Sequence, residues 1–89
     1  MKKIIIFSLT IISVLNVWAQ NTKAEADSAY INNDYVKAIE IYEALLQEGE
    51  AAELYYNLGN SYYKQGDIAK AILTYERAAL LNPNNRDIQ

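Results

Sequence analysis

Apolar side chains recur at helical spacing along residues 35–48 of this chain. The stripe consists of Tyr35, Ala38, Ile39, Tyr42, Leu45 and Leu46. Spacings of three and four residues place these side chains on one face of an α-helix, the face that packs against the rest of a protein. Asp34 precedes the stripe as a candidate N-cap, and Gly49 follows it as a C-terminal stop. The pattern therefore predicts an amphipathic helix over residues 35–48.

Further stripes predict three more helices, so the fold class is all-α. A helix over residues 51–65 has its stripe at Tyr55, Leu58, Gly59 and Tyr62, and the helix opened by Asp67 has Ile68, Ala71, Ile72, Tyr75, Ala78 and Ala79 facing inward. Gly66 closes the first of these helices, and Pro83 ends the second near Leu81 or Asn82, because proline lacks an N–H. Residues 22–32 form the fourth predicted helix. Asn33 follows it where Gly66 stands in the later turn, and Asn is the next-best residue for a left-handed conformation.

An internal repeat organises these helices. A shift of 33 positions pairs Tyr30 with Tyr63, Asp34 with Asp67, Lys37 with Lys70, Ala38 with Ala71, Ile39 with Ile72, Tyr42 with Tyr75 and Glu43 with Glu76. Seven identities within the 14 residues 30–43 exceed chance. A period of this length is typical of helix–turn–helix solenoids. We therefore expect two helix hairpins that stack on one another.

The unit of residues 51–85 resembles a tetratricopeptide repeat. Its signature positions are filled by Tyr55, Leu58, Gly59, Tyr62, Ala71, Tyr75, Ala78 and Pro83. Residues 20–50 resemble a degenerate first copy, in which Ala26 replaces the glycine and Ala29 the tyrosine. The resemblance implies stacked antiparallel hairpins that begin a right-handed solenoid, with a first helix that packs loosely or acts as a cap. Small residues such as Gly59 are needed because larger ones would push crossing helices beyond the roughly 8–10 Å typical of packed pairs.

The N-terminal residues 1–19 have the pattern of a secretory signal peptide. A cationic start precedes an apolar stretch of about a dozen residues, and a small side chain at Ala19 precedes a polar chain. We expect cleavage after Ala19 and export, with a periplasmic or other cell-envelope location. An uncleaved membrane anchor is the alternative, although residues 4–18 are fewer than the roughly 20 that a spanning helix needs.

The whole chain, leader included, resembles the N-terminal part of exported tetratricopeptide-repeat proteins of bacteroidete aerotolerance (Bat-type) operons. That resemblance implies a role in protein–protein interaction in the cell envelope, and such proteins often continue into a further domain. Residues 86–89 look like the start of another helix that is cut short. Three or more repeats are normally needed to bury a continuous core. We therefore expect a fragment of a longer exported protein.

Composition and charge limit the kinds of catalysis and binding that the chain can perform. The chain has no Cys and no His, which excludes disulfides, Cys/His zinc sites, thiol catalysis and histidine-centred triads. Its net charge of -3 becomes -5 without residues 1–19, because two lysines are lost and all eleven acids stay, so the basic footprint of nucleic-acid binding is missing. The carboxylates of Glu40, Glu43, Glu48, Glu50 and Glu53 are interpreted as a solvated helix surface. We expect no enzyme activity, no metal and no cofactor.

The resemblance also implies a concave groove, lined by the first helices of successive repeats, that holds a peptide. The residues expected in it are Lys23, Asp27 and Tyr30 from the first copy and Glu53, Tyr56, Asn60, Tyr63 and Lys64 from the second. Tyrosines suit such a surface because they offer a large contact area with few torsions to fix. Plain scaffold positions are the alternative interpretation. A clamp for a C-terminal carboxylate would use Lys23 and Asn60, but the Asp27 carboxylate would repel that ligand.

The sequence therefore favours a non-catalytic interaction module that binds a peptide or protein of unknown identity. The alternative is a structural element for assembly. In that case the last predicted helix would pack on further repeats, on another domain or on a second copy of the chain.

Overall fold

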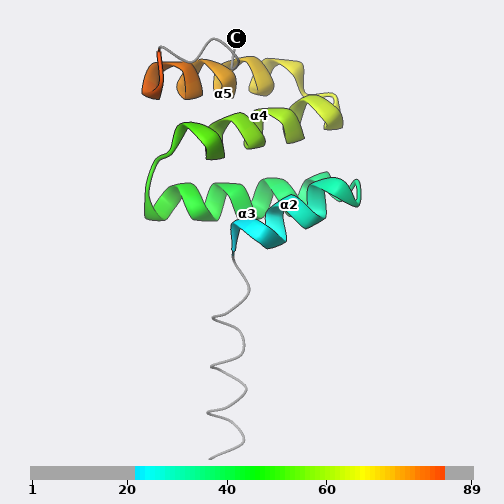
Figure 1. Cartoon of the computed structure of the whole chain (residues 1–89). Helices are drawn as coiled ribbons and strands as arrows, with labels where there is room; N and C mark the ends of the chain where they lie inside the picture. The colour runs from blue at the N-terminus through cyan, green and yellow to red at the C-terminus, as the bar shows by residue number, and fades with distance from the viewer. Residues whose placement is uncertain (1–21, 84–89) are drawn as a thin grey trace, which may run out of the picture.

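The computed structural model describes residues 22–83, and these residues form four α-helices. The helices are α2 (Lys23–Ile31), α3 (Tyr35–Glu48), α4 (Ala52–Gln65) and α5 (Ile68–Leu81). Helix α2 packs against α3, α3 against α4 and α4 against α5, so two helix hairpins stack in one direction (Figure 1). No strand occurs within the described range, and the all-α hairpin stack is confirmed. The expected signal peptide and the expected helix start at residues 86–89 lie outside the described residues.

The helices begin where the capping residues predict. The Asp34 side chain accepts a hydrogen bond from the Lys37 N–H at 3.3 Å, and the Asp67 side chain accepts one from the Lys70 N–H at the same distance. At the start of α2 the Thr22 hydroxyl accepts a bond from the third residue beyond it, at 3.2 Å. These side chains satisfy N–H groups that have no partner within the helix. The predicted ends of all four helices agree with the structure to within one residue, and Asn32 is the C-cap of α2.

The turns inside the two hairpins have the same backbone geometry. Asn33 has φ 64° and Gly66 has φ 93°, so both occupy the left-handed region, as expected for the two turns. Their N–H groups donate to the carbonyls of Tyr30 and Tyr63, in both cases at 3.0 Å. The connection between the hairpins differs, because Gly49 has φ 178° and is extended. Its backbone would suit any residue, and its role as a helix stop does not require glycine.

The core lies between α2, α3 and α4. Its buried members are Ala26, Ala29, Ala38, Ile39, Ile41, Tyr42 and Leu58. Ala26 and Ala29 of α2 are at most 6% exposed, so the first helix packs closely and not loosely. Small residues on α2 compensate for the signature residues that the first copy lacks, because they let the helix approach α3 directly.

The two helices of the second hairpin, α4 and α5, approach each other closely at Gly59. A Cβ atom at this position would lie 2.7 Å from two ring atoms of Tyr75 in α5, closer than carbon atoms can pack. Ala71 and Ala78 of α5 are also buried, at 1% and 0% exposure. The Ser61 hydroxyl, buried in the same hairpin, donates to a backbone carbonyl of its own helix at 3.0 Å. Among the signature residues of the second copy, Gly59 and Tyr75 thus form a close contact between α4 and α5.

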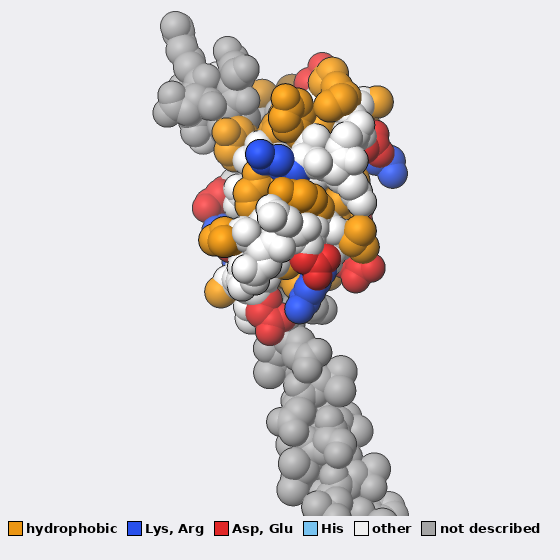
Figure 2. Space-filling view, turned by 90° about the vertical axis from the view of Figure 1, so that its right-hand side faces the viewer, with side chains coloured by type: hydrophobic (Ala, Val, Ile, Leu, Met, Phe, Trp, Pro, Cys, Tyr) orange, Lys and Arg blue, Asp and Glu red, His pale blue; other side chains and the backbone are white. Residues whose placement is uncertain are grey.

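One expectation about α5 is wrong. Ile68 and Ile72 were expected to face inward, yet Ile72 is 54% exposed and Ile68 is 47% exposed. The equivalent of Ile72 in the first copy is Ile39, which is 8% exposed because it shares a core with Leu58 of α4. No helix of the described chain covers the same face of α5. Hydrophobic side chains are correspondingly exposed at the top of Figure 2, at the level of α5 in Figure 1.

We predict that Gly59→Ala destabilises the fold by up to about 2 kcal/mol. Overpacking a filled helix contact costs about 1–3 kcal/mol, which outweighs the gain of about 1 kcal/mol in helix propensity. Urea denaturation followed by circular dichroism measures the change. Gly49→Ala is the matched control, because nothing lies within 4 Å of a Cβ built there. Equal stability of the two variants would contradict the close contact with Tyr75.

Candidate binding site between the two hairpins

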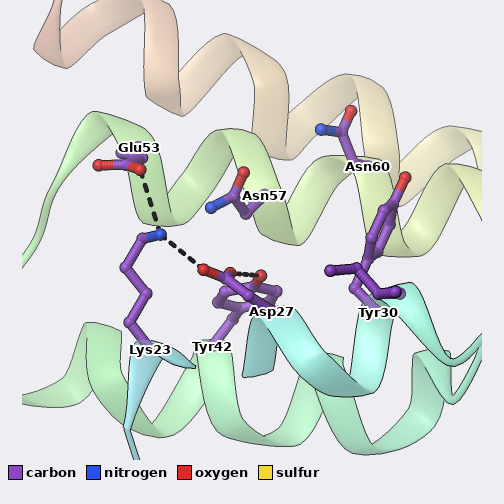
Figure 3. A pocket seen from close by; sticks show the side chains of 8 residues that line it. Lys23, Asp27, Tyr30, Tyr42, Glu53, Asn57 and Asn60 are labelled. Carbon is purple, nitrogen blue, oxygen red and sulfur yellow. Dashed lines mark hydrogen bonds and ion pairs between the residues drawn. The ribbon is translucent and has the colours of Figure 1, made fainter. Parts of the chain in front are cut away.

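A pocket of about 330 Å³ lies between α2 and α4. It is lined by Lys23, Asp27, Tyr30, Ile31, Tyr42, Glu53, Asn57 and Asn60. Four of these residues come from α2, three from α4 and one, Tyr42, from α3. Figure 3 shows Asn57 and Asn60 above Asp27 and Tyr30 in that view, with the pocket between the two helices. The site is therefore built across the two hairpins.

An ion-pair network joins the two hairpins at one end of the pocket. The Lys23 ammonium lies 2.8 Å from a carboxylate oxygen of Asp27, one helical turn further along α2. It also lies 3.2 Å from a carboxylate oxygen of Glu53, in the first turn of α4 (Figure 3). The hydrogen bonds to Asp27 and Glu53 raise the pKa of Lys23 above its usual value, so this ammonium is charged at neutral pH.

Tyr42 holds the other oxygen of Asp27. Its hydroxyl donates a hydrogen bond to Asp27 Oδ1, and Tyr42 is 2% exposed. Burial by itself would raise the pKa of Asp27, but hydrogen bonds from Lys23 and Tyr42 outweigh it and lower that pKa. Burial, together with the Asp27 carboxylate, raises the pKa of the Tyr42 hydroxyl far above its usual value. At neutral pH the pocket therefore contains an ionised Asp27 and a neutral Tyr42.

The second hairpin repeats the tyrosine hydrogen bond with a neutral acceptor. The Tyr75 hydroxyl donates to Asn60 Oδ1. Tyr75 and Asn60 lie 33 positions after Tyr42 and Asp27, so the two pairs are equivalent in the repeat. Tyr56 stands where the first copy has Lys23. Its ring packs against Tyr75 with 5.7 Å between the ring centroids. The two copies therefore share one geometry, but only the first carries charges there.

Five of the eight residues that sequence reasoning placed in the groove line this pocket: Lys23, Asp27, Tyr30, Glu53 and Asn60. Tyr56, Tyr63 and Lys64 do not line it. Tyr56 leans toward α5, where it contacts Tyr75, and Tyr63 is 57% exposed.

Sequence reasoning missed three residues that line the pocket: Ile31, Tyr42 and Asn57. A signal for two of them was present. Asn57 follows Glu53 by four residues and precedes Asn60 by three, so all three lie on one helix face. Tyr42 bears the same relation to Asp27 as Tyr75 bears to Asn60. For Ile31, the last residue of α2, no sequence pattern indicates that its side chain lines the pocket.

The pocket is suited to holding a ligand through contacts. It offers an ammonium, carboxylates, amides and an aromatic ring, which are groups that bind peptides. Among residues 22–83 no group of three or more potential metal-ligating side chains is brought together. In the same range, none of the helices has the length and apolar character required to cross a membrane.

Residues 52–85 match the family model of the tetratricopeptide repeat. This segment contains α4, α5 and the turn between them, so the second hairpin is the part of the chain that matches the repeat, and its two-helix form is consistent with that match. Such repeats are typically non-catalytic modules for protein–protein interaction. No curated protein matches the chain.

We predict that Tyr42→Phe lowers the free energy of unfolding by about 2 kcal/mol, because it leaves a partly buried carboxylate without one of its hydrogen bonds. Tyr35→Phe is the control. It also removes a hydroxyl that donates to a side chain, Asn33 at 2.8 Å, but that bond is exposed. We expect it to cost less than about 0.5 kcal/mol. Urea titrations that give both variants the same stability would contradict a structural role for Tyr42.

Proposed function

We propose that this chain is a non-catalytic interaction module that binds a peptide or protein segment in the pocket between α2 and α4. The observation that carries the proposal is the composition of this pocket. Polar side chains of two successive hairpins, among them Asp27 and Asn57, face one space of about 330 Å³. A peptide laid there would contact both hairpins at once, and a segment that contacts both would hold them in a fixed relation.

The apolar part of the pocket adds contact area. Tyr30 and Ile31, at the C-terminal end of α2, line it beside the polar groups, and Ile31 is 76% exposed. A large apolar side chain at such exposure is free to be covered by a ligand. The Tyr30 ring is held edge-on against Tyr35 with 5.6 Å between the centroids, so little side-chain entropy is lost when it is covered.

The proposal includes export to the cell envelope. The pattern of residues 1–19 supports it, and so does the resemblance of the whole chain to exported Bat-type tetratricopeptide-repeat proteins. In that setting the module would recognise another envelope protein and would carry no catalytic activity of its own.

Selection from a library of random short peptides displayed on phage tests the proposal. We expect selected peptides to bind the full chain, and Asn57→Ala or Ile31→Ala to weaken their binding about three- to tenfold, because each removes a contact in the pocket. Val36→Ala is the matched control. Val36 is an aliphatic residue on α3 that is 55% exposed and outside the pocket. Calorimetric affinities that are the same for all three variants would argue against this pocket.

A second function, assembly through α5, is favoured by the exposure of Ile68 and Ile72. We expect Ile72→Glu to convert any dimer or polymer of the chain to a monomer, because burying a charge in an apolar contact is unfavourable. Light scattering measures the mass in solution. Val36→Glu places the same charge on an exposed aliphatic position of α3 and serves as the control. A wild-type chain that is monomeric at high concentration would rule out self-assembly.

A further inference from the structure

The charges that line the pocket between α2 and α4 sum to a negative value. Lys23 contributes one positive charge, against the carboxylates of Asp27 and Glu53. Its ammonium already lies 2.8 Å from one carboxylate and 3.2 Å from the other. An incoming carboxylate would have to compete with both for this single cation. An incoming cation, in contrast, meets one unbalanced negative charge.

Both carboxylates have capacity for a further donor. The Asp27 side chain is 38% exposed and the Glu53 side chain is 70% exposed. A carboxylate can accept about four hydrogen bonds. Within residues 22–83, Asp27 accepts bonds from Lys23 and Tyr42, while Glu53 contacts Lys23. A donor from a ligand could therefore be added without breaking the existing network.

The remaining lining suits the other parts of a basic residue. Tyr30 offers an aromatic ring, which attracts a cation placed over its face. Ile31 offers an apolar surface for the methylene groups of a Lys or Arg side chain. Asn57 and Asn60 carry amide N–H groups that can donate to a peptide carbonyl. The Oδ1 atom of Asn60 is already engaged by Tyr75, which fixes the orientation of its amide.

Building on the proposed binding function, we infer that the pocket recognises a peptide segment through a Lys or Arg side chain that contacts the Asp27 and Glu53 carboxylates alongside Lys23. A C-terminal carboxylate is not the anchor. The neutral Asn60 and Tyr56, at the equivalent positions of the second hairpin, provide no such charge. The preference for a basic segment therefore resides in the first copy.

Peptides selected on the full chain, as above, provide the probe. We expect them to carry a Lys or Arg whose replacement weakens binding about three- to tenfold, as for the loss of one charge-assisted contact at a partly exposed site. For an Arg peptide the replacement is citrulline, which keeps the shape and removes the charge. Amidation of the peptide C-terminus is expected to leave the affinity unchanged.

For each variant of the protein, the inference predicts whether the affinity for the basic peptide falls or rises. Glu53→Gln and Asp27→Asn should weaken binding of the basic peptide about three- to tenfold. Asp27→Asn can keep the hydrogen bond from Tyr42, because Asn60 accepts the same bond from Tyr75. Lys23→Gln should tighten binding, because it removes a positive charge that repels the basic side chain of the ligand. Glu40→Gln is the control, since it removes an equal charge from an exposed position outside the pocket.

Two results would overturn the inference while leaving the proposed function intact. One is a set of selected peptides that need Asn57 but contain no essential basic residue. The other is a peptide that loses affinity on amidation of its C-terminus and on Lys23→Gln, which would show that a carboxylate is the anchor. Failure to select any peptide that depends on the pocket would overturn both the proposed function and the inference.

Discussion

Each hairpin depends on one tyrosine in its second helix. Tyr42 in α3 and Tyr75 in α5 each donate a hydrogen bond to a residue fifteen positions earlier, Asp27 and Asn60 respectively. The residue that precedes each acceptor is small, so the tyrosine can lie against the backbone of the first helix. Gly59 shows how tight this contact is, because even a Cβ atom there would meet the Tyr75 ring at 2.7 Å. The distance between the helices is thus set by the ring, and their register by the hydroxyl.

The same interaction determines the chemistry of the pocket. The acceptor of each tyrosine bond, Asp27 or Asn60, also lines the pocket between the hairpins. Each acceptor therefore takes part both in the packing of its hairpin and in the pocket surface. Asp27 uses one oxygen for Tyr42 and the other for Lys23, which in turn reaches Glu53 on the next hairpin. A residue needed for packing thereby orients the charged end of the pocket. Replacing it with a neutral acceptor, as at Asn60, preserves the fold and removes the charge.

Much of the fold followed from local sequence signals. Asp34 and Asp67 marked helix starts, and Asn33 and Gly66 marked the left-handed turns, because these residues act on backbone groups within a few positions. The exposure of Ile68 and Ile72 on α5 could not be predicted from such local signals. The apolar stripe at Ile72 shows which face of the helix is suited to packing, but whether another element covers that face depends on the rest of the structure.

The site was harder to predict than the fold for a related reason. Residues on one helix face span a wide arc, and only those that point toward the neighbouring hairpin line the pocket. Glu53 does so, whereas Tyr56 turns toward Tyr75. The contact between Lys23 and Glu53 joins residues 30 positions apart, and the 33-residue repeat could not reveal it, because Tyr56 replaces the lysine in the second copy. The features that distinguish the two copies, and not those that they share, thus give the pocket its charge.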